Sequence, residues 1–154
     1  LDEGTQQLLK VVWSSGKLLE YNIQSQLSQR KVESSSYEFN FVETSRMDLQ
    51  AAIEDVFKPF EVQMQDRKIK SEVTVTGKFP YRFSLDTKIY KQSIFNVIQN
   101  AVKFNKPKGT IKVAAKYRAT DQCLITTVTD TGIGVSPEKQ QTLFKVFGQG
   151  GLSD

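Results

Sequence analysis

The sequence predicts a two-layer α/β sandwich preceded by a long helical arm. Helical and strand patterns alternate along the chain, which is typical of a sheet packed against helices. The last two strand patterns, 111–118 and 123–129, are separated by only four residues. This link is too short for a crossover between parallel strands, so the two strands should form an antiparallel hairpin. A doubly wound parallel fold therefore fits less well.

The composition limits the chemistry that this chain can perform. Its 154 residues suffice for one domain, or for one domain and an arm. The absence of histidine excludes His-based acid–base catalysis and His metal ligands within this chain. The single cysteine cannot form an internal disulfide, which suits a reducing compartment, so we expect a cytoplasmic location. No run of eighteen apolar residues is present, and we expect no membrane-spanning segment.

The formal net charge of +4 does not by itself indicate nucleic-acid binding. Six cationic residues fall between positions 103 and 118, but Lys112 and Lys116 lie on one side of an alternating strand pattern. No aromatic residues that would stack on bases are interleaved with them. We interpret the run as a solvated face and expect no nucleic-acid partner.

Residues 5–32 form the predicted arm. An apolar stripe recurs every three or four residues along it, formed by Leu9, Val12, Leu19, Ile23 and Leu27 and widened by Leu8, Val11 and Leu18. One helix cannot bury such a stripe on itself. The stripe should therefore pack against another helix or a second copy of the chain; the alternative is that the arm folds back on its own domain. The polar, serine-rich segment 31–36 is predicted to be a hinge.

The remaining elements follow from periodicity and capping signals. Alternation at Tyr37, Phe39 and Phe41 predicts a strand. Asp48 is the expected N-cap of a helix over 49–66, which Pro59 should kink or split. Further predictions are a strand at 69–75, a helix from the N-cap Asp86 to about 104, the hairpin 111–129 and a helix starting at 136–137.

The helix after Asp86 has two distinct predicted faces. Its apolar face, expected to lie on the sheet, consists of Tyr90, Ile94, Val97, Ile98 and Ala101. Its polar face consists of Gln92, Asn96, Asn100 and Lys103. Most such polar faces are only solvated, but these usually favour Glu and Lys over paired Asn. Asparagine offers an oxygen to a hard cation and an amide donor to phosphate, and lysine adds positive charge.

The segment Asp130-Thr131-Gly132-Ile133-Gly134 follows the last predicted strand directly. Alone, this pattern is a common turn. Its glycines also allow the backbone to bend closely around a ligand. A buried carboxylate at the end of a strand is costly unless it meets a donor, and the exocyclic amine of adenine is one such donor.

Three stretches together resemble the N, G1 and F boxes of sensor histidine kinases. They are Asn96-x-x-x-Asn100-Ala101-x-Lys103-Phe104, Asp130-Thr131-Gly132-Ile133-Gly134 and Leu143-Phe144-x-x-Phe147-x-Gln149. The resemblance covers about residues 37–151 and implies the Bergerat-type fold, a mixed sheet with helices on one face. It also implies ATP binding in a cleft under a mobile lid. The arm, 1–36, resembles the second helix of the family's dimerisation and phosphotransfer hairpin, which leaves 37–154 as the catalytic domain.

The resemblance implies specific roles for individual residues. Asn100 would be the Mg²⁺ ligand, and Asn96 and Lys103 would face the phosphates of ATP. Phe104 would lie near the adenine, and Asp130 would accept from its amine. The loop residues of the expected ATP site are Gly132, Ile133 and Gly134. Phe144 and Phe147 would anchor the base of the lid, a role compatible with plain core aromatics.

The chain departs from the family pattern in two functional respects. It has no phospho-accepting histidine, and it stops at Asp154, inside the expected lid and before a second glycine box. We therefore expect an incomplete catalytic domain that is inactive alone.

The implied function is γ-phosphoryl transfer to a histidine outside this chain, within a two-component phosphorelay. The implied partners are a second copy joined through the arm, a histidine-bearing helix of the same parent protein, and a response-regulator receiver domain. One alternative is a hydrolytic ATPase of the same fold. In such enzymes the N box has the form Glu-x-x-x-Asn, and the Glu serves as a base. This chain has Asn96 at the position of the Glu, and an amide cannot act as a base. Another is a non-catalytic dimerisation or scaffold relative.

Overall fold

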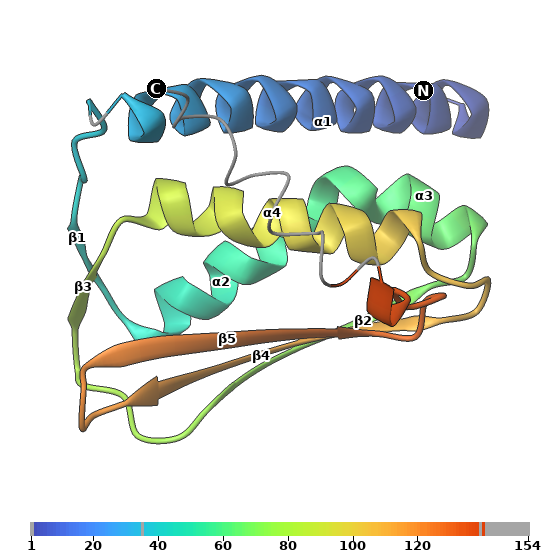
Figure 1. The fold of residues 1–154 in the computed structure, drawn as a ribbon. Coiled ribbons are helices and arrows are strands. Elements are labelled where there is room, and N and C mark those ends of the chain that lie inside the picture. The colour runs from blue at the N-terminus through green and yellow to red at the C-terminus, as the bar shows by residue number, and fades with distance from the viewer. Residues whose placement is uncertain (1, 35, 139, 141–154) are drawn as a thin grey trace.

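The computed structural model describes residues 2–34, 36–138 and 140. Helix α1 (Glu3–Glu33) lies across the outside of the other helices, and these cover one face of the sheet (Figure 1). The helical layer contains α2 (Arg46–Phe57), the 3-10 turn η1 (Lys58–Phe60), α3 (Glu61–Asp66) and α4 (Thr87–Lys103). The strands are β1 (Val42–Thr44), β2 (Lys70–Thr76), β3 (Phe83–Leu85), β4 (Thr110–Arg118) and β5 (Cys123–Asp130). No described helix is both long enough and apolar enough to cross a membrane.

The main sheet is mixed. Its strand order is β2-β4-β5, with β2 parallel to β4 and β4 antiparallel to β5. β1 and β3 form a separate antiparallel pair. The α/β sandwich with a mixed sheet, helices on one face and a helical arm is therefore confirmed, including the 111–129 hairpin.

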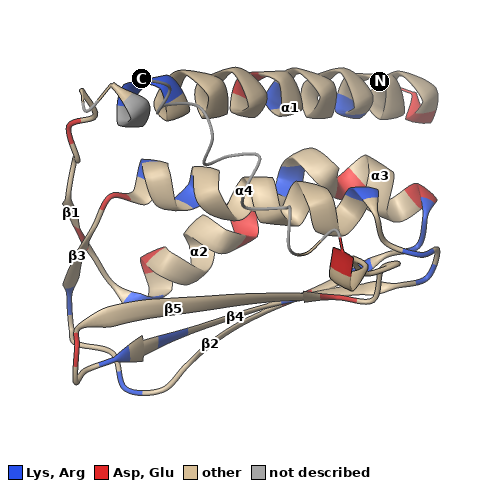
Figure 2. Cartoon of the chain, viewed as in Figure 1, with Lys and Arg blue, Asp and Glu red and all other residues tan. Residues whose placement is uncertain are grey.

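Alternation along β4 separates the core from solvent. Ile111, Val113 and Ala115 are almost fully buried and pack in the core cluster with Ile94 and Ile98 of α4. The intervening positions of β4 are exposed on the other face, where Lys112 pairs with Glu72 of β2 across 2.8 Å. Lys and Arg positions are spread over all layers of the fold rather than gathered on one (Figure 2).

The predicted strand at Tyr37–Phe41 is wrong. The strand begins only at Val42, and the three aromatic side chains before it pack on one another, with ring centroids 5.0 Å and 5.7 Å apart. The backbone N–H of Asn40 donates to the carboxylate of Asp86 at 2.9 Å instead of to a neighbouring strand. This side-chain acceptor replaces the ladder that alternation predicts.

The start of α2 also differs from the prediction. Ser45, not Asp48, is the N-cap: its hydroxyl accepts from the N–H of Asp48, and the Asp48 carboxylate accepts from the N–H of Ser45. This reciprocal pair is a capping box that uses Asp at the third position. Pro59 ends α2 as expected, because the chain continues through η1 into α3.

Helix α1 folds back on its own domain through a face that shares only Leu18 with the predicted apolar stripe. Tyr21 stacks on Phe95 of α4, with ring centroids 4.3 Å apart, and Leu18 packs on the same core. Ser14 and Ser28 are buried along this face. The five main residues of the predicted stripe point elsewhere, and each is about half exposed, from 49% to 61%. The arm is therefore packed on the domain on one side and open on the other.

Two α4 residues differ in burial from the faces predicted for them. Val97, expected on the sheet, is 49% exposed, whereas Gln92, expected on the polar face, is only 5% exposed. α4 is covered by the sheet on one side and by α1 on another, so the helical period alone does not separate its buried and exposed positions.

Asp86 anchors the start of α4. Its carboxylate is 3% exposed and accepts from the N–H groups of Lys88, Ile89 and Asn40 and from the Tyr37 hydroxyl, at 2.9–3.1 Å. Burial alone would raise the pKa of Asp86, but these four donors lower it below its usual value. The predicted N-cap is confirmed, and it also attaches segment 37–40 to α4.

Replacing Asp86 with Ala should lower the free energy of unfolding by about 2–3 kcal/mol at pH 7, because four donors lose their acceptor. The folded pKa lies below the unfolded value, so this contribution is present above about pH 4 and is lost as the pH falls further. Urea unfolding at pH 7 and pH 3 measures the effect.

Two variants control this measurement. Asp86→Asn should approach wild-type stability as the pH falls, and Asp66→Ala, at an exposed position, should change stability by less than about 0.5 kcal/mol. An Asp86→Ala protein as stable as wild type at pH 7 would show that the carboxylate does not anchor α4.

Candidate functional site

Asn96, Asn100 and Lys103 are all exposed along one side of α4. Asn96 faces α1, where its Nδ2 donates to the Ser25 hydroxyl at 3.0 Å. One turn further, Gln99 Nε2 donates to Asn22 Oδ1 at 3.2 Å. The first part of the expected phosphate-facing side is therefore in polar contact with the arm.

Asn100 and Lys103 line a pocket of about 580 Å³ between α1, η1, α3 and α4. Its other lining residues are mostly polar or basic: Leu18, Asn22, Phe60, Gln63, Arg67 and Gln99. The pocket combines amide groups with two cationic side chains. These groups suit phosphate oxygens, which accept hydrogen bonds and carry negative charge.

The C-terminal end of α4 is fixed by Arg67, a residue that the sequence analysis did not identify. Its guanidinium donates to the carbonyl of Val102 at 2.5 Å and to the carbonyl of Asn105. These carbonyls lie at the end of a helix, where a cation is favoured by both hydrogen bonding and the helix dipole. Phe104 is the C-cap, and Lys103 Nζ lies 5.1 Å from the centre of its ring.

The glycine loop after β5 packs directly on this helix end. The N–H of Ile133 donates to the carbonyl of Phe104 at 3.1 Å. A Cβ on Gly132 would lie 2.6 Å from the same carbonyl oxygen. Only glycine permits this close approach without a shift of the backbone. The expected N-box residue Phe104 and G1-box residues Gly132 and Ile133 are thus brought together.

The register of the hairpin directs Asp130 toward the helical layer. Asp130 lies opposite Ile111, a core residue, and directly opposed residues point to the same face of a sheet. The carboxylate Oδ1 accepts from the N–H of Gly132 at 2.7 Å. Asp130 is solvent-exposed, so its carboxylate is accessible to a ligand on the α4 side.

A network of hydrogen bonds around buried Asn105 holds the glycine loop in place. Asn105, 5% exposed, accepts through Oδ1 from the N–H of Lys106 and from the Thr131 hydroxyl, both at 3.0 Å. Thr131 Oγ1 in turn accepts from the N–H of Thr110 at 2.9 Å. The sequence signal that could have indicated Asn105 is its position before the Lys106-Pro107-Lys108-Gly109 turn, where Asn often bonds to the backbone.

The described residues contain no cluster of three or more His, Cys, Asp or Glu side chains that could hold a metal alone. The Asn100 amide oxygen is a suitable ligand for Mg²⁺, an ion usually bound by few protein groups together with substrate phosphates. Phe147, the remaining residue of the expected ATP site, and Phe144 lie outside the described residues. Gly134 has a φ of +69° and open space around its α-carbon.

A known family matches the second half of the chain. Residues 85–153 match the family described as histidine kinase-, DNA gyrase B-, and HSP90-like ATPase. The match begins at the end of β3, just before the N-cap Asp86, and includes α4, the hairpin and the glycine loop.

Curated relatives include two bacterial proteins that match nearly the whole chain. The aerobic respiration control sensor protein ArcB homolog of Haemophilus influenzae is 27% identical over 149 residues, covering 97% of this chain and 44% of the relative. The circadian input-output histidine kinase CikA of Synechococcus elongatus is 30% identical over 154 residues, covering 97% and 19%. The chain thus spans less than half the length of these relatives.

A solved structure of histidine kinase ThkA in complex with response regulator protein TrrA has the same fold. It covers 94% of this chain and 41% of its own, with a TM-score of 0.58 and 21% sequence identity. The matched region is long enough to include α1 as well as the sandwich. Residues 85–153 therefore form a domain that matches the histidine kinase-, DNA gyrase B-, and HSP90-like ATPase family, and the curated relatives that match nearly the whole chain are sensor proteins that include a histidine kinase.

Proposed function

We propose that this chain is the ATP-binding catalytic part of a two-component sensor histidine kinase, with residues 37–154 as the catalytic domain. It would position ATP so that the γ-phosphoryl group passes to a histidine outside this chain. The observation that carries the proposal is the packing of Gly132 and Ile133 on the Phe104 carbonyl. This contact joins the adenine side of the expected site to the helix that carries its phosphate side.

The contacts support a division of roles along the site. Asp130, directed toward the helical layer, would accept from the adenine amine, next to the Phe104 ring. Asn100 and Lys103 share a polar pocket with Arg67, and they would bind the phosphates. Bound Mg²⁺ would neutralise phosphate charge, with Asn100 Oδ1 as its protein ligand. Asn96 would contribute its amide to the phosphates once it separates from Ser25.

The identity of residue 96 favours phosphoryl transfer over hydrolysis. An amide cannot take a proton from water, so Asn96 cannot activate a hydrolytic nucleophile. The chain contains no histidine, and the acceptor must come from a partner or from another part of a longer protein. The product would be a phosphohistidine from which a response-regulator receiver domain takes the phosphoryl group. The ThkA complex contains a partner of this class.

The outer stripe of α1 is the surface that we propose for homodimerisation. Leu9, Val12 and Leu19 are each more than half exposed, and Ile23 and Leu27 continue the stripe. Residues 1–36 would then be the second helix of a dimerisation and phosphotransfer hairpin. We place this part of the protein in the cytoplasm, since its single cysteine is an exposed free thiol.

Mg²⁺ should strengthen ATP binding to the wild-type chain by at least about tenfold, because it neutralises phosphate charge. In Asn100→Ala this strengthening should be largely lost. Calorimetry with ATP in magnesium or in EDTA measures both proteins, and Asn40→Ala is the control because that exposed side chain does not line the pocket of Asn100 and Lys103. An equal magnesium effect in Asn100→Ala would mean that the metal ligand is misassigned.

The phosphoryl transfer is tested with radiolabelled ATP and a histidine-bearing dimerisation hairpin of the parent type supplied with the chain. We expect an acid-labile, base-stable product, reduced at least about a hundredfold by Asn100→Ala, since positioning and charge neutralisation supply the catalysis. Release of free phosphate without labelled hairpin would favour the hydrolytic alternative.

The two glycines of the loop should respond differently to alanine. Gly132→Ala places a Cβ 2.6 Å from the Phe104 carbonyl oxygen, so it should displace the loop and weaken ATP binding by at least about tenfold. Gly134→Ala meets no atom within 4 Å and adds only the strain of a positive φ, about 1 kcal/mol. Comparable ATP affinity in the two variants would show that the contact with Phe104 does not shape the site.

Charged substitutions on the stripe should prevent dimerisation without unfolding the domain. Leu19→Glu with Ile23→Glu places two carboxylates in an apolar seam, whereas neither residue packs on the core. Light scattering across a concentration series should show a dimer for wild type and a monomer for this variant. The control is Lys10→Glu, outside the stripe, and a monomeric wild type at high concentration would contradict the proposal.

A further inference from the structure

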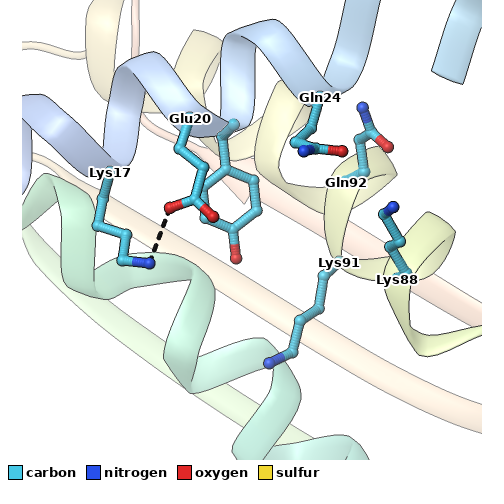
Figure 3. A pocket seen from close by; sticks show the side chains of 7 residues that line it. Lys17, Glu20, Gln24, Lys88, Lys91 and Gln92 are labelled. Atoms are coloured by element: carbon cyan, nitrogen blue, oxygen red, sulfur yellow. Dashed lines mark hydrogen bonds and ion pairs between the residues drawn. The ribbon is translucent and has the colours of Figure 1, made fainter. Parts of the chain in front are cut away.

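A second pocket lies between α1 and the first two turns of α4, separate from the candidate ATP site. Its volume is about 250 Å³, and it is lined by Lys17, Glu20, Tyr21, Gln24, Lys88, Lys91 and Gln92 (Figure 3). It shares no lining residue with the pocket of Asn100 and Lys103. The family resemblance assigns no role to any of these residues.

Gln92 is the unusual group in this pocket. It is 95% buried, since only 5% of its surface is exposed, and neither Nε2 nor Oε1 has a hydrogen-bond partner among the described residues. A buried amide without partners is costly, and few are found in folded proteins. The pocket is much larger than a single water molecule, which occupies about 30 Å³ in the liquid. The geometry therefore leaves space for a molecule that satisfies both ends of the amide.

The charges around Gln92 favour an anion. Three lysines line the pocket, and its single acidic residue, Glu20, is already paired with Lys17 at 2.8 Å. Lys91 reaches away toward α2, where it pairs with Asp55 at 3.0 Å (Figure 3). Lys88 forms no ion pair within the described part of the chain, and its ammonium group lies on the same side of the pocket as Gln92 in Figure 3.

We propose that this pocket binds a small hydroxy- or amino-carboxylate. The carboxylate would accept from the Lys88 ammonium and from Gln92 Nε2, a charge-assisted combination. The neighbouring hydroxyl or amine would donate to Gln92 Oε1, which a plain carboxylate cannot do. The Tyr21 side chain, stacked on Phe95, supplies part of the wall from α1.

Such a ligand would hold the arm on the domain. Its pocket is formed by α1 on one side and α4 on the other, so it binds only when Tyr21 is seated on Phe95. A ligand that binds one conformation stabilises it by mass action. The occupied pocket would therefore also favour the Ser25–Asn96 contact one turn further along α4.

L-malate is the probe for the test, and calorimetry on the full chain is the measurement. Saturable binding is expected in the millimolar range or tighter. Lys88→Met and Gln92→Leu should each weaken it by at least about tenfold, because each removes a bond to the carboxylate. Succinate, which lacks the hydroxyl, should bind at least about threefold more weakly than L-malate.

Lys116→Met is the matched control: it removes an exposed lysine of β4 that does not line the pocket, and L-malate affinity should stay unchanged. Gln92→Leu changes a buried side chain and can disturb folding. Lys88→Met changes an exposed side chain, so its effect on L-malate affinity tests the site separately from folding. Absence of saturable L-malate binding, or equal binding by wild type and Lys88→Met, would overturn the proposal. Equal affinity for succinate would overturn the role of Gln92 Oε1. No nucleotide is needed, so the result does not depend on the proposed kinase function.

Discussion

Helix α4 is fixed at both ends by charged side chains that satisfy backbone groups, and the rest of the structure takes its position from this helix. The Asp86 carboxylate accepts at the start, and the Arg67 guanidinium donates at the end. Between them, Ile94 and Ile98 pack on the sheet and Phe95 packs on Tyr21 of α1. The glycine loop then rests on the last carbonyl groups. Both halves of the candidate site are thus placed relative to one rigid element.

The sandwich could be predicted from the sequence because its signals are local. The alternation of β4, the short link before β5 and the Asp86 cap each depend on neighbouring residues. The failures involve distant partners. Segment 37–41 has strand alternation, but the Asp86 carboxylate takes the N–H of Asn40, and no periodicity can indicate this. Gln92 was misplaced for the same reason, because α1 covers it.

The residues of the candidate site that would face a ligand could be predicted from the sequence, but the residues that hold them in place could not. Asn100, Asp130 and the glycines could be identified because residues of these types occur at a recognisable spacing along the chain. Arg67 holds the helix end, but a lone Arg in a connecting segment has no distinctive pattern. Asn105 holds the loop, and its only sequence signal is its position before a Pro- and Gly-containing turn. Likewise, the inner face of α1 has buried serines beside Leu18 and Tyr21, so its apolar pattern is weak, yet it is the face that packs on the domain.

The register between β4 and β5 limits insertions in the hairpin that these strands form. Asp130 lies opposite Ile111, seven ladder positions from the Arg118–Cys123 pair beside the turn, and the turn at 119–122 contains Gln122 at a φ of +52°. Because side chains alternate across a strand, a single insertion that shifted the pairing by one residue would turn Asp130 to the lysine-bearing face. The same shift would separate Ile133 from Phe104. The length of the hairpin tip is therefore constrained by a site at the opposite end of the strand.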